Sequence, residues 1–168
     1  MKYFSKLELI RCFRENKNER CKECRLTQAA MTLPNGAEEN IEALVSAVLD
    51  PAREALGKPI VVTSGFRCMV HNTAVGSKPT SQHIRGMAAD LTAGSPEDNL
   101  KLARIIVKNG NYDQLIAYLN ADGSMKPRFL HVSWKKGGGN HHEVRKHLTG
   151  WNSYPLLTAE EMKLLNGR

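Results

Sequence analysis

Residues 81–90 contain a histidine and an aspartate whose spacing suits metal binding. His83 and Asp90 are separated by a segment that includes one glycine and two alanines, small residues that allow close packing. A second histidine, His131, interrupts the apolar and aromatic alternation of residues 129–134, a pattern typical of a strand. Two imidazoles and one carboxylate would leave one position of a four-coordinate zinc open for water, as a catalytic zinc requires. Residue types alone leave simpler interpretations open, such as a packed strand histidine, or a helix cap beside a surface residue.

The cysteines offer a second, weaker metal hypothesis. Cys21 and Cys24 have the CxxC spacing of a zinc chelator, but no second pair follows. Cys12 and Cys68 would complete a structural four-sulfur zinc site only if the fold brought them together. A redox role is less favoured because no βαβ pattern surrounds the CxxC. Four unevenly spaced cysteines are also too few for a disulfide framework in a chain of 168 residues.

Length and composition predict one globular domain over residues 1–168. Apolar content of 41% and charged content of 24% are ordinary for such a domain, and no apolar run is long enough to insert into a membrane. The net charge of +7 favours polyanions, and both nucleic acid and an anionic cell wall qualify. Because the basic residues are scattered and not interleaved with aromatics, we expect no specific nucleic-acid partner.

Hydrophobic periodicity and capping residues predict four helices and four strands. The expected helices are 3–15, 38–56, 96–109 and 158–165, and the expected strands are 58–64, 88–92, 112–119 and 128–134.

Several local features refine this outline. The β-branched run at 58–64 predicts a buried strand, and the composition of 72–79 predicts a loop. Pro51 is expected to kink the long helix or to start a second piece of it. After a glycine-rich bend, three further histidines lie in a polar stretch that could be helical, and we expect them at the surface; they are His141, His142 and His147.

The last two expected strands should form a hairpin, because Asp-Gly is a strong turn signal between them. The two-residue period of a strand then divides the second one into two faces. The face that we expect toward the core carries Leu130, Val132 and Trp134, and the face toward a cleft carries Phe129, His131 and Ser133.

Four motifs, taken in order, resemble the peptidase M15 family. They are Ile60–Arg67, Ser81–Asp90, Asp113–Ile116 and Leu130–Ser133. The family comprises zinc D-Ala-D-Ala carboxypeptidases and related endolysin-type peptidases, and within it this chain is similar to the members of subfamily A. The resemblance runs over about residues 3–134 and leaves 135–168 as a C-terminal extension. It implies an α+β fold like that of the zinc D-Ala-D-Ala carboxypeptidase and hedgehog group, with a small antiparallel sheet flanked by helices.

The resemblance also implies roles for particular residues. His83, Asp90 and His131 would bind one catalytic Zn²⁺. Arg67 matches the family arginine that holds substrate near the metal, and a structural ion pair is its alternative role. Substrate-lining positions are expected for Ser81 and Gln82.

The residue that transfers the proton is the point of departure from the family. Many relatives carry an acidic residue three positions before the last histidine or at the end of the Asp-Gln-Leu-Ile strand, and those positions hold Arg128 and Tyr118 here. Asp113 is the nearest surviving carboxylate in sequence and is the predicted catalytic acid or base, although strand alternation places it on the face opposite Tyr118. Other candidates are Asp122, Glu143 and His141.

The expected function is that of a zinc metallopeptidase that cuts an amide bond in peptidoglycan stem peptides or cross-links, as a DD-carboxypeptidase or an endolysin-type endopeptidase. A zinc-containing module that binds the cell wall without turnover is the alternative, and a basic nucleic-acid binder is a third reading. We expect a monomer. The start of the chain lacks the apolar run of a secretory signal. This fits synthesis in the cytoplasm, followed either by release to the wall through a phage holin or by a role as a cytoplasmic recycling enzyme.

Overall fold

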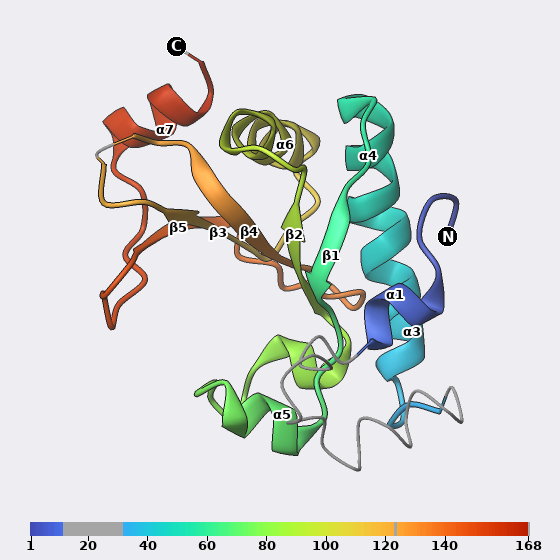
Figure 1. Ribbon diagram of the computed structural model, residues 1–168. Helices are drawn as coiled ribbons and strands as arrows, with labels where there is room; N and C mark the ends of the chain where they lie inside the picture. Colours follow the sequence, from blue (N-terminus) through green and yellow to red (C-terminus); the bar gives the residue numbers. More distant parts are fainter. Residues whose placement is uncertain (12–31, 123, 168) are drawn as a thin grey trace.

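The structure is a computed structural model that describes residues 1–11, 32–122 and 124–167. Its centre is a five-stranded sheet with the strand order β1-β2-β4-β3-β5. The strands are β1 (Val61–Ser64), β2 (Ala88–Thr92), β3 (Gln114–Leu119), β4 (Pro127–Ser133) and β5 (Glu143–Leu148). Helix α6 packs on β4 and α4 packs on α6, whereas α5 lies near the end of β1, away from α6 (Figure 1). The predicted α+β class is confirmed.

The helical segments include every helix that the sequence predicts within the described residues, and two more. They are α1 (Lys6–Ile10), α3 (Ala37–Leu44), η2 (Val45–Leu49), α4 (Asp50–Leu56), α5 (Met69–Ala74), η3 (Gln82–Arg85), α6 (Pro96–Asn109) and α7 (Ala159–Leu165). Helix α6 has its predicted bounds, with Ser95 as N-cap and Gly110 as left-handed C-cap. Capping boxes begin α1 and α7, because a hydroxyl and a glutamate three residues later satisfy each other's backbone N–H groups.

The long helix expected at 38–56 runs through α3, η2 and α4 without a break. Its middle segment, Val45–Leu49, has π-helical hydrogen bonds and lies just before Pro51 in the first turn of α4. A proline has no N–H to donate, and its ring clashes with the carbonyl four residues earlier. The wider π-helical turn before Pro51 accommodates its ring, and α4 begins there as a second piece of the helix, which is one of the two outcomes that the sequence predicts.

The two faces of the sheet differ as the sequence predicts. The face against the helices carries fully buried apolar side chains, among them Leu91, Leu115, Leu130 and Val132. On the opposite face, Asp90 pairs in register with His131, and His131 pairs with Ile116. The hairpin of β3 and β4 is antiparallel, as expected.

Strand β1 and helix α5 differ from the predictions for 58–64 and 72–79. Strand β1 is the edge of the sheet, and Val61 is 54% exposed rather than buried, because only β2 pairs with it. The segment predicted to be a loop begins instead within α5, a short helix whose N-cap is Cys68. Asn72 stabilises the turn that follows by donating to the carbonyls of Ser77 and Lys78.

Strand β5 differs most from what the sequence predicts. The polar stretch around His147 forms a strand rather than a helix, and it pairs parallel with β3, so the sheet is not wholly antiparallel. Backbone pairing with an open sheet edge satisfies the N–H and C=O groups of a segment that has little apolar patterning of its own, with only Val144 fully buried. His141 and His142 are exposed as predicted, but His147 is half-buried.

The cysteine site of the sequence analysis lies mostly outside the described residues, since Cys12, Cys21 and Cys24 fall within 12–31. The part of the predicted first helix beyond Arg11 falls there too. Cys68 is buried at the start of α5. Among the helices that the structure describes, none has the length and apolar character needed to cross a bilayer.

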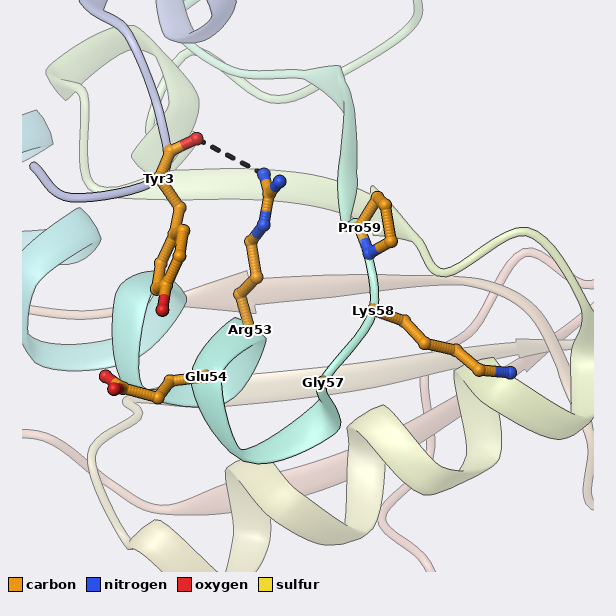
Figure 2. Close-up of a pocket in the computed structure, with 6 residues that line it drawn as sticks. All are labelled: Tyr3, Arg53, Glu54, Gly57, Lys58 and Pro59. Atoms are coloured by element: carbon orange, nitrogen blue, oxygen red, sulfur yellow. Dashed lines mark hydrogen bonds between the residues drawn. The ribbon is translucent and has the colours of Figure 1, made fainter.

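A pocket of about 280 Å³ opens between the N-terminal segment and the end of α4 (Figure 2). Its lining residues are Tyr3, Arg53, Glu54, Gly57, Lys58 and Pro59. Arg53 donates to the carbonyl of Tyr3 across it. The pocket lies before the start of β1. The metal-ligating candidates lie beside the other end of this strand, at Ser64.

We expect Gly65→Ala to lower the free energy of unfolding by about 1–3 kcal/mol, a typical cost of forcing extra volume into a packed site. A Cβ at Gly65 would lie 2.1 Å from the carbonyl oxygen of Leu9 in α1, which would have to move. Urea unfolding in the presence of a chelator measures this cost without a contribution from bound metal. Gly137→Ala is the matched control, since a Cβ there meets open space, and an equal loss in both variants would contradict the packing argument.

Candidate metal centre

Three side chains from three segments meet on the open face of the sheet. His83 comes from η3, Asp90 from β2 and His131 from β4. The Nε2 atom of His83 lies 3.1 Å from Nδ1 of His131. The Oδ1 atom of Asp90 lies 2.9 Å from Nδ1 of His131 and 3.3 Å from Nε2 of His83. Tetrahedral zinc with bonds of about 2.0–2.1 Å holds its ligand atoms roughly 3.3–3.4 Å apart. The donor set and its spacing therefore fit one zinc ion.

The sheet register fixes two of the three side chains. Asp90 and His131 face each other across β2 and β4, so both side chains project from the same face. His83 reaches them from η3, which ends at Gly86 in a left-handed conformation. A Cβ at Gly86 would lie 2.4 Å from the carbonyl oxygen of Ala37, so a glycine is needed where η3 packs on α3.

The carbonyl oxygen of Gly65 orients the His83 ring. It lies 2.7 Å from Nδ1 of His83 and accepts the proton of that nitrogen. The Nε2 lone pair then points at the other two ligand candidates. A hydrogen bond to the distal ring nitrogen is the usual way in which a protein fixes the tautomer and direction of a metal-binding histidine.

Arg67 pairs with the second oxygen of the Asp90 carboxylate. Its Nη2 atom lies 2.5 Å from Oδ2 of Asp90, its Nε donates to Ser64 and its Nη1 donates to Ser77. The guanidinium thereby holds one carboxylate oxygen and leaves Oδ1 directed at the two imidazoles. This is the ion pair that the sequence left open as an alternative role for Arg67. Its contact with substrate stays a prediction.

Burial and mutual contacts set the protonation of the cluster. Burial lowers the pKa of His83, which favours the neutral imidazole. Burial alone would raise the pKa of the Asp90 carboxyl, but the imidazoles of His83 and His131 outweigh it and bring that pKa well below its ordinary value. A carboxylate beside a neutral imidazole is the form in which these groups bind a metal ion.

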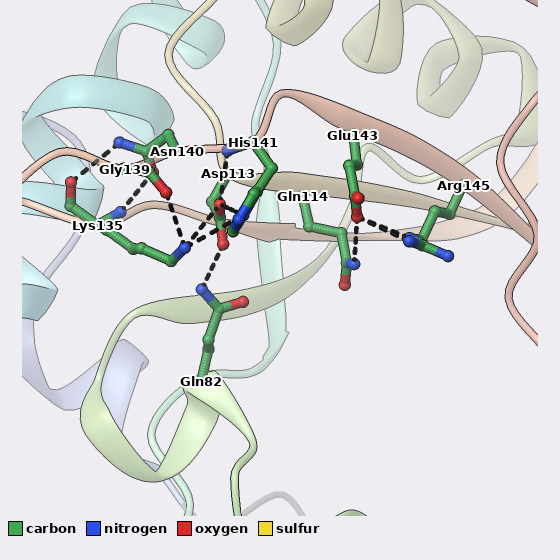
Figure 3. Close-up of polar contacts among 9 residues, drawn as sticks. All are labelled: Gln82, Asp113, Gln114, Lys135, Gly139, Asn140, His141, Glu143 and Arg145. Carbon is green, nitrogen blue, oxygen red and sulfur yellow. Dashed lines mark hydrogen bonds and ion pairs between the residues drawn. The ribbon is translucent and has the colours of Figure 1, made fainter.

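Asp113, the predicted catalytic carboxylate, lies in a separate hydrogen-bond network (Figure 3). It accepts from Nε2 of Gln82 at 2.7 Å, from the backbone N–H of His141 at 2.8 Å and from Nζ of Lys135 at 3.1 Å. Burial raises the pKa of this carboxyl, but the hydrogen bonds from His141, Lys135 and Gln82 outweigh it and lower the pKa. The network ties the segment that carries His83 to the loop after β4. Catalysis by Asp113 stays a prediction.

The other predicted site residues also have partners. Ser81 caps η3 by accepting from the backbone N–H of His83, and Gln82 uses its amide on Asp113. Substrate contacts of both stay predictions. Glu143 is paired with Arg145 and also contacts Gln114 (Figure 3).

The positions where relatives carry an acid differ in their surroundings. Arg128 is exposed, with its guanidinium over the ring of Phe129. Tyr118 is on the same face of β3 as Ile116, which pairs with His131. Asp122 lies in the exposed turn between β3 and β4, where it accepts from the backbone of Ser124.

Sequence reasoning missed Ser64, Ser77 and the carbonyl of Gly65 as parts of this centre. Ser64 pairs in register with Asp90 across β1 and β2, a contact that needs the strand pairing to be known. Ser77 approaches Arg67 only because α5 turns the chain back. A backbone carbonyl leaves no signal in residue types, so nothing in the sequence could have indicated Gly65 as the partner of His83.

Comparison with known proteins agrees with this arrangement. A sequence model of the family described as Peptidase M15 matches residues 2–133, which include all three ligand candidates. The chain belongs to the peptidase M15 family. A zinc D-Ala-D-Ala carboxypeptidase of Streptomyces albus G is 50% identical to it over 48 residues, a match that spans 28% of this chain and 19% of that protein. The predicted family is thereby confirmed.

We expect His131→Ala to bind one zinc ion fewer per chain than the wild type, because only His83 and Asp90 remain of the three ligand candidates and two ligands hold the ion poorly. Zinc per chain after gel filtration, measured by mass spectrometry of the metal, gives the result. His142→Asn is the matched control, since His142 is an exposed histidine with a positive φ that asparagine tolerates. Equal zinc content in the wild type and His131→Ala would place the ion elsewhere.

Arg67→Lys should weaken zinc binding about 10–100-fold, the usual effect of losing a partner that orients a metal ligand. The planar guanidinium contacts Asp90, Ser64 and Ser77 simultaneously, and a lysine ammonium cannot make all three contacts at once. Competition with a chromophoric chelator measures the affinity. Arg85→Lys, at an exposed arginine of η3, controls for the change of side chain. An affinity equal to that of the wild type would show that Arg67 does not orient Asp90.

Proposed function

We propose that the protein is a zinc-dependent peptidase that hydrolyses an amide bond in peptidoglycan stem peptides or their cross-links. The observation that carries this proposal is the convergence of His83, Asp90 and His131 at zinc-ligand spacing within the residues matched by the family. A zinc ion held there would polarise the scissile carbonyl and lower the pKa of a water molecule toward neutrality.

The chain's own groups support this chemistry in two ways. Gly65 and Arg67 fix the direction of His83 and Asp90, so the ligand atoms need little rearrangement on binding the ion. Arg67 uses three of its five N–H groups on Ser64, Ser77 and Asp90. The guanidinium therefore retains donors for a substrate carboxylate or for a carbonyl oxygen that gains negative charge.

The substrate class rests on two supports. The relative from Streptomyces albus G is named for its action on D-Ala-D-Ala, which ends peptidoglycan stem peptides. The net charge of +7 favours the anionic surface of a cell wall and raises the local concentration of the enzyme there.

A module that binds zinc and the cell wall without turnover is the second candidate. It is favoured by one observation, that Tyr118 and Arg128 occupy the positions where many relatives carry the acidic residue. Proton transfer by a positioned side chain contributes about 10²–10⁴-fold to such reactions, so its loss matters.

Purified protein incubated with peptidoglycan fragments should release new amino groups or free D-Ala, and a chelator should abolish the release. Added zinc should restore it, because the ligand cluster remains folded around its own hydrogen bonds. Chromatography of the products also tells which bond is cut. Binding to the wall without any product would support the non-catalytic module and contradict the proposed activity.

A further inference from the structure

Tyr118 lies on the face of the sheet that carries the ligand candidates. In β3 and β4, Ile116 pairs with His131 and Tyr118 pairs with Phe129. Residues two apart on a strand project from the same face, about 6–7 Å apart along it. The Tyr118 side chain therefore starts one step along the sheet from His131, and a phenol is long enough to span that step.

Aromatic neighbours hold the Tyr118 ring in place. It stacks on Phe129 with centroids 4.1 Å apart and an interplanar angle of 16°. His147 lies 5.0 Å from it and Tyr154 lies 6.2 Å from it, centroid to centroid. His147 and Tyr154 stack on each other in turn. Both come from β5 and the loop that follows, beyond the residues matched by the family.

Charges of the metal centre act on the phenol. Burial raises the pKa of Tyr118 most. The Tyr154 phenol raises this pKa further through its charge and through a hydrogen bond between the two side chains, the Asp90 carboxylate also raises it, and the Arg67 guanidinium lowers it. A phenol with a raised pKa keeps its proton at neutral pH and can donate a hydrogen bond, but it cannot act as a base.

We propose that Tyr118 is a catalytic hydrogen-bond donor, which stabilises the carbonyl oxygen of the scissile amide as that oxygen gains negative charge. This role rests on the proposed function. In hydrolysis, the water oxygen bonds to the carbonyl carbon, the C–N bond breaks, the nitrogen takes both protons of the water, and the products are a carboxylate and an ammonium group. Tyr118 keeps its own proton throughout. It thus differs from an acidic residue at the same position, which would accept and return a proton.

The residues that pack against the Tyr118 ring from β5 and its following loop lie outside the range 2–133 matched by the family. Strand β5 adds His147 to the sheet edge beside Tyr118, in register with it. The Nε2 atom of His147 lies 3.0 Å from the carbonyl of Trp151, which fixes that ring against the loop. We assign His147 and Tyr154 a positioning role, since they contact the Tyr118 ring rather than the ligand candidates.

The test compares Tyr118→Phe with the wild type, both loaded with zinc. Phenylalanine keeps the ring and its stacking on Phe129 but removes the hydroxyl. We expect unchanged zinc content and melting temperature, and a kcat/KM about 10²-fold lower, as for loss of one oxyanion donor. The affinity for a phosphinate peptide that mimics the tetrahedral anion, measured by calorimetry, should fall by a similar factor, while the affinity for the peptide product stays the same.

Tyr3→Phe is the matched control, because Tyr3 lines the pocket before the start of β1 (Figure 2), whereas Asp90 pairs with Ser64 at the other end of that strand. It should leave turnover and phosphinate affinity unchanged. Tyr118→Glu is a second variant, in which a carboxylate at this position repels the phosphinate anion and lowers its affinity at least as far as Tyr118→Phe does.

Three results would count against the assignment, and they differ in what else they affect. Wild-type turnover and phosphinate affinity in Tyr118→Phe would contradict the donor role alone. Wild-type protein that holds zinc but hydrolyses no peptide would contradict the proposed function and this role with it. Wild-type phosphinate affinity in Tyr118→Glu would also count against the donor role.

Discussion

The structure depends on the burial of a carboxylate and two imidazoles at one point on a sheet. The side chains of Asp90, His83 and His131 are only 13%, 3% and 11% exposed. A buried carboxylate costs several kcal/mol unless opposite charge and hydrogen bonds compensate. Arg67 compensates one oxygen of Asp90, and the other faces ring nitrogens. A cation bound at this point would accept lone pairs from both imidazoles and from the carboxylate at the same time.

Several contacts elsewhere in the fold position the three ligand candidates. Close approach of α1 to the end of β1 excludes a side chain at Gly65, whose carbonyl directs His83. Asn99, a buried residue of α6, accepts from the backbone after β2 and donates to the carbonyls at the start of β4, so it ties the two ligand-bearing strands to one helix. The Asp113 network joins the His83 segment to the loop that leads into β5. Parts of the chain beyond the family match thus brace the same centre.

The sequence predicted elements whose signals are local. The bounds of α6, the strand 88–92 and the two faces of β4 followed from caps and periodicity. The three ligand candidates could be named because their spacing and the family resemblance agreed. Strand β5 was missed, since its order comes from pairing with β3 rather than from its own residues. The ion pair between Arg67 and Asp90 could not be assigned from the sequence for a similar reason, because it depends on how two distant segments meet.

X-ray absorption at the zinc edge tests the central claim most directly, because it reports which atoms surround the ion. We predict a first shell of nitrogen and oxygen only, at about 2.0–2.1 Å, with the multiple-scattering signature of two imidazoles. A shell dominated by sulfur at about 2.3 Å would place the zinc on cysteines and would contradict a His83, Asp90 and His131 site, as would protein that is pure and folded but takes up no zinc.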